Sequence, residues 1–253
     1  MFGKGGPLLL IAGFSMPMDG WDPVVLDRLS LNHTIIVFDN RGIGSTTLGT
    51  KTPSIQHFAN DTSLLIDKLE INRPVDVLGI SLGGYIAQEL ALSQPQKVNK
   101  LILVGTDCGV YSTTHTIPPQ ITPEVASSMD SGNFSVETFV STMFPTNWLK
   151  VNKQHVLKLF SGVTEVSKQG IEIQNQAAGT WTGTCERLSS INKSTLVLVG
   201  TEDIVRPPQN SVMLAQMIPG AWLVQIQEAG HGVMYQYPEK VSNIIETFLE
   251  TTN

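Results

Sequence analysis

The residues best suited to chemistry in this sequence form a Gly-x-Ser-x-Gly motif, Gly79-Ile80-Ser81-Leu82-Gly83. A short β-branched run precedes it, and apolar residues at helical spacing follow it. This order predicts a strand, a sharp turn and a helix, with Ser81 at the apex and glycines where a Cβ atom would collide. Such a serine projects its hydroxyl group at a helix N-terminus, where the helix dipole favours developing negative charge. The motif therefore predicts a nucleophile that attacks a carbonyl carbon.

A serine hydroxyl group needs a base that removes its proton, and that base needs an acid that holds it in one tautomer. His231 fits the base, because it lies between two glycines directly after the last apolar strand run, Ala221 to Ile226. The other histidines lie before a strand, in a helix or in the long segment between strands: His33, His57, His115 and His155. We therefore predict that His231 is the general base.

Two aspartates are candidates for the acid. Asp203 follows the strand run Thr195 to Val199, and Asp107 follows the run Leu101 to Val104. Both satisfy the chain order serine, acid, histidine. We favour Asp203, because its strand is expected to neighbour the strand that precedes His231. Asp107 remains the alternative acid.

The negatively charged oxygen of the transition state needs two hydrogen-bond donors. The backbone N–H group of Leu82, at the start of the predicted helix, is one candidate. The N–H group of Phe14 is our choice for the other, because Gly13 permits the turn that would direct it toward the site. The Phe14 side chain would then be free to line a pocket for the acyl group.

Apolar strands that alternate with helices predict an α/β fold with a doubly wound, mostly parallel sheet of about six strands. In such sheets the working groups lie at the carboxyl ends of the strands. We expect residues 1–109 and 189–253 to form this core, and residues 110–188 to form a helical insertion over the strand ends. Most apolar residues of the insertion should pack against one another. Three are candidates for binding substrate: Met143, Trp148 and Trp181.

Composition bounds the partners and the compartment. The formal net charge of -6, without a Lys/Arg cluster, argues against nucleic-acid binding. No apolar run reaches the roughly 18 residues of a membrane span, and the N-terminus lacks the pattern of a signal peptide. Cys108 and Cys185 have no metal-type spacing, which predicts buried free thiols and a cytoplasmic setting. The expected partner is a small ester-like molecule, and the predicted reaction needs neither metal nor cofactor.

These motifs together resemble those of the α/β-hydrolase superfamily over essentially the whole chain. The resemblance implies a triad of Ser81, Asp203 and His231, with residues 110–188 as a cap. Two departures are that Ala12 stands where histidine is usual and that the usual opening antiparallel hairpin is missing. The matching segments are Gly13-Phe14, Asp39 to Ser45, Gly79 to Gly84, Gly200 to Asp203 and Gly230 to Gly232.

The branch that the chain looks most like holds small esterases, enol-lactonases, carbon–carbon bond hydrolases and cofactor-free perhydrolases. We expect a serine hydrolase that cleaves small to medium apolar carboxylic esters through an acyl-enzyme. A lactonase, a carbon–carbon bond hydrolase or a perhydrolase would use the same triad, although Leu82 stands where perhydrolase-like members often carry methionine. A non-catalytic ligand-binding member of the fold is the alternative from another class.

One further motif, Gly42-Ile43-Gly44-Ser45, begins like a dinucleotide-binding loop. It lacks the third glycine and opens no obvious helix, so it does not meet the structural context of that motif. We expect Asp39 and Arg41, just before it, to form a structural turn beside the site.

Overall fold

The computed structural model describes residues 1–50, 52–109, 119–123, 125, 127–128 and 135–251. Its centre is a seven-stranded sheet with the order β1-β3-β2-β4-β5-β6-β7. The strands are β1 (Phe2–Gly3), β2 (Gly6–Ile11), β3 (His33–Val37), β4 (Val75–Ile80), β5 (Val98–Val104), β6 (Thr195–Gly200) and β7 (Trp222–Ile226).

The strands β3, β2, β4, β5, β6 and β7 pair in parallel, so the parallel sheet predicted from the sequence is confirmed. The two-residue strand β1 adds a short antiparallel pair with β3 at one edge. It is too short to give a periodic signal, which is why the sequence indicated about six strands. Parallel pairing brings the carboxyl ends of all the longer strands to one edge of the sheet.

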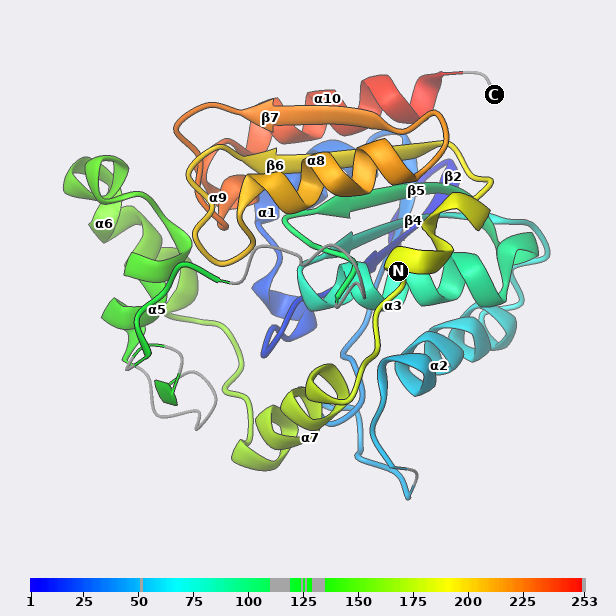
Figure 1. Cartoon of the computed structure of the whole chain (residues 1–253), viewed down its shortest axis with the longest axis horizontal. Helices are drawn as coiled ribbons and strands as arrows, with labels where there is room; N and C mark the ends of the chain where they lie inside the picture. Colours follow the sequence, from blue (N-terminus) through cyan, green and yellow to red (C-terminus); the bar gives the residue numbers. More distant parts are fainter. Residues whose placement is uncertain (51, 110–118, 124, 126, 129–134, 252–253) are drawn as a thin grey trace.

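Helices cover both faces of this sheet (Figure 1). On one face α2, α3 and α8 pack against inward-facing residues such as Leu9, Val77 and Leu103. On the other face α1, α9 and α10 pack against alternate residues such as Leu10 and Leu78. Burial on both faces is what makes these strands read as continuous apolar runs. The helices are α1 (Pro23–Ser30), α2 (Ile55–Lys68), α3 (Leu82–Ser93), α8 (Pro208–Met217), α9 (Val233–Gln236) and α10 (Pro238–Glu250).

Among the described residues between β5 and β6, three further α-helices occur: α5 (Val136–Met143), α6 (Thr146–Phe160) and α7 (Lys168–Gly179). A cluster that includes Phe144, Val156 and Tyr235 buries one side of α5 and α6. In Figure 1 these two helices lie beyond one end of the sheet, and α7 lies near α2 and α3. A fourth helix predicted near residues 123–129 falls partly outside the described residues. Three short 3-10 helices complete the described elements: η1 (Met18–Gly20), η2 (Pro95–Lys97) and η3 (Cys185–Ser190).

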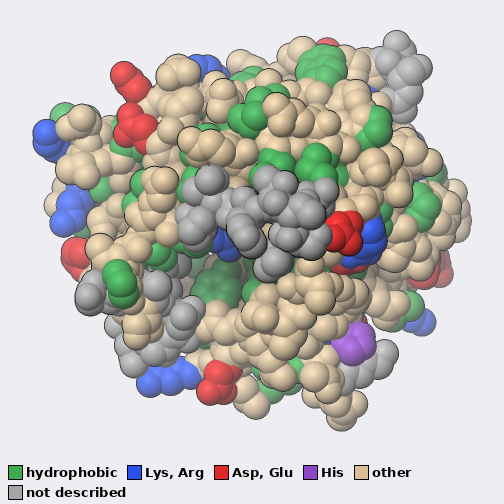
Figure 2. All heavy atoms as spheres, viewed as in Figure 1, with side chains coloured by type: hydrophobic (Ala, Val, Ile, Leu, Met, Phe, Trp, Pro, Cys, Tyr) green, Lys and Arg blue, Asp and Glu red, His purple; other side chains and the backbone are tan. Residues whose placement is uncertain are grey.

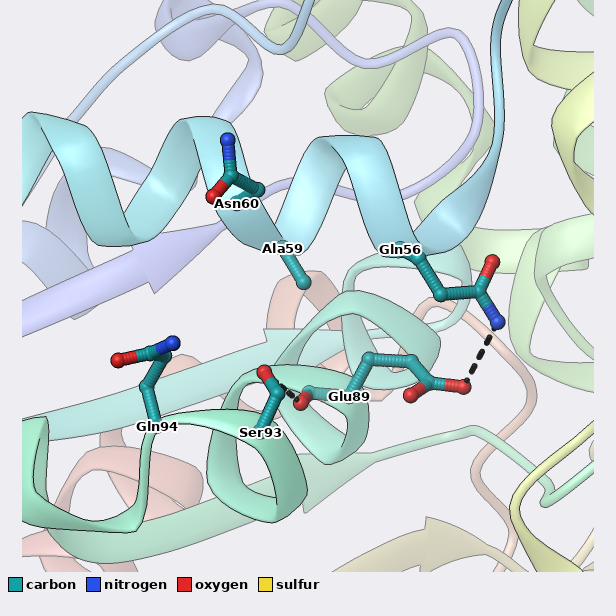
Figure 3. A pocket seen from close by; sticks show the side chains of 6 residues that line it. All are labelled: Gln56, Ala59, Asn60, Glu89, Ser93 and Gln94. Carbon is teal, nitrogen blue, oxygen red and sulfur yellow. Dashed lines mark hydrogen bonds between the residues drawn. The ribbon is translucent and has the colours of Figure 1, made fainter.

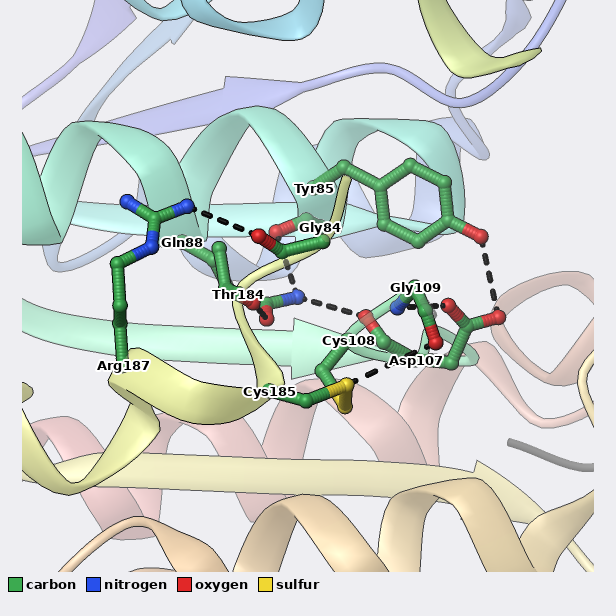
Figure 4. The surroundings of a disulfide bond; sticks show 10 residues. Gly84, Tyr85, Gln88, Asp107, Cys108, Gly109, Thr184, Cys185 and Arg187 are labelled. Atoms are coloured by element: carbon green, nitrogen blue, oxygen red, sulfur yellow. Dashed lines mark hydrogen bonds between the residues drawn. A yellow bond between two sulfur atoms is a disulfide. The ribbon is translucent and has the colours of Figure 1, made fainter. Parts of the chain in front are cut away.

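The prediction of free thiols is wrong, because Cys108 and Cys185 form a disulfide with their Cα atoms 4.9 Å apart (Figure 4). The two residues are 77 positions apart in the sequence, so no spacing pattern pointed to the pair. The bridge joins the loop after β5 to η3, where the chain returns toward β6. It also removes the observation on which the cytoplasmic prediction rested. In the described part of the chain, no helix is both long and apolar enough to cross a membrane.

Replacing both cysteines with alanine is expected to lower the free energy of unfolding by about 2–4 kcal/mol, because the bridge restricts a long loop in the unfolded chain. The measurement is urea unfolding of the variant and the oxidised wild type, followed by circular dichroism. The reduced wild type should unfold at the same urea concentration as the variant. Identical midpoints for the oxidised wild type and the variant would contradict a stabilising bridge.

Candidate functional site

Ser81 sits at the turn between β4 and α3, as the sequence predicted. Its backbone has φ 52° and ψ −119°, and residues other than glycine rarely adopt a positive φ. A Cβ atom on Gly79 would lie 2.3 Å from the carbonyl oxygen of Gly83, and one on Gly83 would lie 2.1 Å from that of Ile11. The two glycines of the motif are therefore required by the close approach of neighbouring backbone, which confirms the predicted reason for them.

Hydrogen bonds to the end of β5 hold the strained Ser81 backbone in place. Its N–H group donates to the carbonyl oxygen of Val104 at 2.9 Å, and its own carbonyl oxygen accepts from the Thr106 hydroxyl group at 2.8 Å. Strain at one residue persists only where the surroundings over-determine it, and such strain is typical of functional sites. The turn thus presents Ser81 at the carboxyl edge of the sheet.

His231 and Asp203 form a buried pair. His231 Nδ1 and Asp203 Oδ2 are 2.8 Å apart, and the residues are 4% and 2% exposed. The other carboxylate oxygen, Oδ1, accepts hydrogen bonds from the backbone N–H groups of Val205 and Arg206. A carboxylate that accepts on both oxygens requires the proton on Nδ1 of the ring. In the neutral form of the ring, Nε2 then carries the lone pair that a general base requires.

Gly105 lies between the His231–Asp203 pair and the residue that binds Ser81. It directly follows Val104, which binds the Ser81 N–H group, and a Cβ atom on Gly105 would lie 3.3 Å from both Asp203 Oδ2 and His231 Nδ1. The serine turn and the His–Asp pair therefore meet at the end of β5. A hydrogen bond between the Ser81 hydroxyl group and His231 is not among those made by the described residues, and such bonds often form only once substrate is present.

The glycines beside His231 make room for the segment between β5 and β6. The N–H group of Gly232 donates to the Met143 carbonyl oxygen at 2.7 Å. A Cβ atom on Gly232 would lie 2.3 Å from the ring of Phe144, and one on Gly230 would lie 2.7 Å from Met143 O. The end of α5 is consequently seated directly on the loop that carries His231.

Asp107, the alternative acid, is placed elsewhere. Its carboxylate accepts from the Tyr85 hydroxyl group at 3.0 Å and from the Gly109 N–H group at 2.8 Å (Figure 4). Nε of Arg206 lies 3.0 Å away, an ion pair by distance, although its N–H is not aligned for a hydrogen bond. Burial opposes the charge on Arg206, but Tyr85 and the two aspartates outweigh it and raise the pKa of the guanidinium group. The geometry therefore supports Asp203 as the partner of His231.

The loop chosen for the second oxyanion donor lies against the serine turn. A Cβ atom on Gly13 would be 3.5 Å from Ser81 Cβ, within ordinary contact distance. No hydrogen bond from the N–H groups of Phe14 or Leu82 occurs among the described residues, so neither donor is committed within them. Both N–H groups thus remain candidates for binding an oxyanion.

Two of the candidate substrate-binding residues, Met143 and Trp148, lie in the apolar cluster of α5 and α6, where Trp148 stacks on Phe144 with ring centroids 5.2 Å apart. Phe14 packs against the core beside the sheet. Hydrophobic side chains form the floor of a hollow in the face shown in Figure 2. The apolar cluster adjoins the site through Phe144, whose ring lies against Gly232 beside His231.

Trp181 has a packing role that the sequence did not indicate. Its ring stacks on Tyr85 at a centroid distance of 4.2 Å, and its Nε1–H group donates to Glu89 Oε1 at 2.8 Å. It is 7% exposed and belongs to the main core cluster. A side chain that is stacked, hydrogen-bonded and buried in this way fastens the chain after α7 to α3, so we do not retain it as a substrate contact.

Gln174, on α7, was missed by the sequence analysis. It is fully buried, and its Oε1 accepts from the Ser15 N–H group, next to Phe14, at 2.7 Å. No local signal could have identified it, because a glutamine on a mixed polar and apolar helix is ordinarily exposed. Its partner lies 159 residues away in the sequence.

A separate pocket of about 160 Å³ lies between α2 and the C-terminal half of α3, lined by Gln56, Ala59, Asn60, Glu89, Ser93 and Gln94 (Figure 3). Glu89 is about two helical turns from Ser81, roughly 12 Å along the axis at 1.5 Å per residue. Its carboxylate is already bound by Gln56, Trp181 and Arg187. This pocket is therefore distinct from the serine turn, and its charged group is neutralised within the protein.

The loop after β3 has the structural role expected of it. Asp39 accepts hydrogen bonds from the N–H groups of Met18 and Ser45. Arg41 makes two hydrogen bonds to Asp61, at 2.8 and 2.7 Å. The glycine-rich motif opens no helix, since the next helix, α2, begins only at Ile55. The prediction of a structural turn is thus confirmed.

Known proteins resemble this chain along nearly its whole length. A poly(3-hydroxyalkanoate) depolymerase of Ectopseudomonas oleovorans is 30% identical over 252 residues, which cover 96% of this chain and 84% of the relative. A thermophilic esterase from Thermogutta terrifontis superposes with a TM-score of 0.83 at 24% identity, covering 98% of this chain and 90% of that one. An enol-lactonase from Burkholderia xenovorans superposes with a TM-score of 0.84 at 19% identity, covering 98% and 93%.

The last two similarities concern the fold alone, because the sequences are distant. A family model described as the alpha/beta hydrolase fold matches residues 6–238, which include the serine turn, Asp203 and His231. The seven-stranded, mostly parallel sheet has the same architecture. By this match along most of its length, the chain belongs to the alpha/beta hydrolase family.

Proposed function

We propose that this protein is a serine hydrolase that cleaves small to medium apolar carboxylic esters through an acyl-enzyme. The observation that carries the proposal is the buried His231–Asp203 pair beside the strained Ser81 turn. An orientated base next to a nucleophile at a helix N-terminus is the arrangement that acyl transfer needs. The hydrolase relatives of the chain support the same class of reaction.

In the proposed reaction His231 Nε2 removes the proton of the Ser81 hydroxyl group while Oγ attacks the ester carbonyl carbon. The tetrahedral intermediate places its negative oxygen between the N–H groups of Leu82 and Phe14. His231 then gives its proton to the departing alcohol, and the C–O bond breaks to leave the acyl group on Ser81. Water, deprotonated by His231, then attacks the acyl carbon. His231 returns that proton to Ser81 Oγ as the bond between Oγ and the acyl carbon breaks and the acid leaves. Asp203 stabilises the charged imidazolium in both halves of the reaction.

We also propose that residues 110–188 act as a cap over this site. The support comes from contacts with two loops of the site. The end of α5 binds the His231 loop through Met143 O, and α7 binds the loop next to Phe14 through Gln174. The preference for apolar esters follows from the aromatic cluster at the end of α5, which offers burial to an alkyl or aryl group.

The proposal is tested with a fluorophosphonate probe, which reacts only with an activated serine. The folded protein should be labelled once, and peptide mapping should place the label on Ser81. Heat-denatured protein is the control and should not be labelled. A folded protein that resists the probe would support a ligand-binding member of the fold and would overturn the proposal.

A further inference from the structure

We propose that Gln174 is a positioning residue of the oxyanion loop, Gly13 to Ser15, and that it acts from helix α7. The inference rests on the proposed function, because it assigns the loop the task of holding the Phe14 N–H group. Gln174 Oε1 accepts the Ser15 N–H group at 2.7 Å, and the Gln174 side chain is fully buried. Ser15 is the residue directly after the proposed donor, so this bond limits where the Phe14 peptide can lie.

Helix α7 is itself firmly seated. A Cβ atom on Gly170 would lie 2.3 Å from the carbonyl oxygen of Gly42, and a Cβ atom on Gly42 would lie 2.5 Å from the Ile173 side chain. Residues 170 and 174 are one helical turn apart and share a face. The contact of α7 with the loop after β3 therefore fixes the position of Gln174 relative to Ser15.

The loop needs such support. Ser15 has φ 54°, a left-handed conformation that is unfavourable for a residue with a side chain. Within the loop, the Met16 N–H group donates to the Gly13 carbonyl oxygen at 3.3 Å, close to the upper limit for a hydrogen bond. The shorter bond, from Ser15 to Gln174, comes from outside the loop. Residues held in sparsely populated conformations persist only where the surroundings enforce them.

The contribution of Gln174 to folding stability does not by itself explain why this position carries an amide. Rotating it would turn Nε2 toward the Ser15 N–H group and place two donors face to face. In the observed orientation Nε2 is buried and has no hydrogen-bond partner within the described ranges. An unsatisfied buried donor is unfavourable, so an apolar side chain of similar size would serve the packing at least as well. What the glutamine adds is the acceptor for Ser15.

The expected consequence concerns the transition state. Oxyanion donors act only when they lie within hydrogen-bond distance of the place where the charge develops. A displacement of about 1 Å can cost roughly 100-fold in rate. Loss of the Gln174 acceptor should therefore weaken the Phe14 donor and slow the chemical step, with little effect on binding of the uncharged ester.

The test is Gln174→Met, assayed with p-nitrophenyl butyrate, with kcat expressed per site titrated by the fluorophosphonate probe. We expect kcat to fall by about 10- to 100-fold while KM changes less than about twofold, and the affinity for a trifluoromethyl ketone to fall by the same factor as kcat. Gln176→Met is the matched control, because Gln176 lies on the same helix with an exposed side chain. It should behave like the wild type.

Each other outcome overturns the inference. Equal kcat values for the two variants, or a change confined to KM, would show that Gln174 does not position the loop, while an active wild type would leave the proposed function standing. If Gln174→Met does not fold, Gln174→Leu takes its place. Failure of both to fold, with Gln176→Met folded, would make Gln174 a structural residue. A wild type without ester turnover and without label on Ser81 would end the proposed function and the inference together.

Discussion

Ser81→Ala is expected to reduce kcat for p-nitrophenyl acetate and butyrate by roughly 10⁶-fold, close to the effect of removing a whole triad, because the members of such a unit act together. The variant loses only the hydroxyl group of residue 81 and keeps its Cβ atom. The hydrogen bonds of the Ser81 backbone with Val104 and with the Thr106 hydroxyl group do not involve the Ser81 side chain, so they remain. The fold should therefore be unchanged, and the loss should be chemical.

The measurement is steady-state turnover of both esters, with circular dichroism to verify folding. Ser211→Ala is the matched control: Ser211 is buried like Ser81 but lies on α8, and its hydroxyl group has no hydrogen-bond partner in the described part of the chain. That variant should retain the wild-type rate. Equal turnover by wild type and Ser81→Ala would mean that the nucleophile is another group and would refute the mechanism.

Asp203→Asn is expected to reduce kcat by about 10⁴-fold, because the amide N–H group can donate a hydrogen bond to Nδ1 and so favour the tautomer that carries its proton on Nε2. In that tautomer His231 cannot accept the proton of Ser81. The change keeps the size of the side chain, and its amide oxygen can still accept from the Val205 and Arg206 N–H groups. The effect should therefore appear in kcat more than in stability.

Asp107→Asn is the control for this experiment, since Asp107 was the alternative acid and undergoes the same chemical change. Its carboxylate contacts Tyr85, Gly109 and Arg206 instead of His231. The asparagine removes the charge that pairs with the largely buried Arg206, which should lower stability. It keeps an acceptor for Tyr85 and none of these contacts involves Ser81 or His231, so the rate should stay within about tenfold of the wild type. Loss of activity in Asp107→Asn with retention in Asp203→Asn would reverse the assignment of the acid.

Much of the site could be predicted because its parts are local. The Ser81 turn is encoded by two glycines, at positions where neighbouring backbone leaves no room for a Cβ atom. The strand and the helix around the turn follow from apolar spacing. His231 could be identified because the parallel order of the strands sends every loop after a strand to the same edge. These features depend on residues a few positions apart and on a topology that alternating strands and helices impose.

The strand count and the cysteines show where such reasoning fails. Strand β1 has two residues and no periodicity, and it exists because β3 offers a free edge for pairing. Cys108 and Cys185 carry no pairing signal in their spacing, and only the return of the chain from α7 to η3 brings them together.

The amino-acid sequence alone thus determined the fold class and sufficed to predict a nucleophile and a base, because steric exclusion at a turn and the alternation of strands and helices are local properties. Only the tertiary structure showed that Asp203 and not Asp107 contacts His231, that Trp181 packs in the core, that the two cysteines are joined and that Gln174 lies against the loop of Phe14. Each of these depends on a contact between distant segments, and the free energy of such a contact is set by packing that no spacing in the chain records.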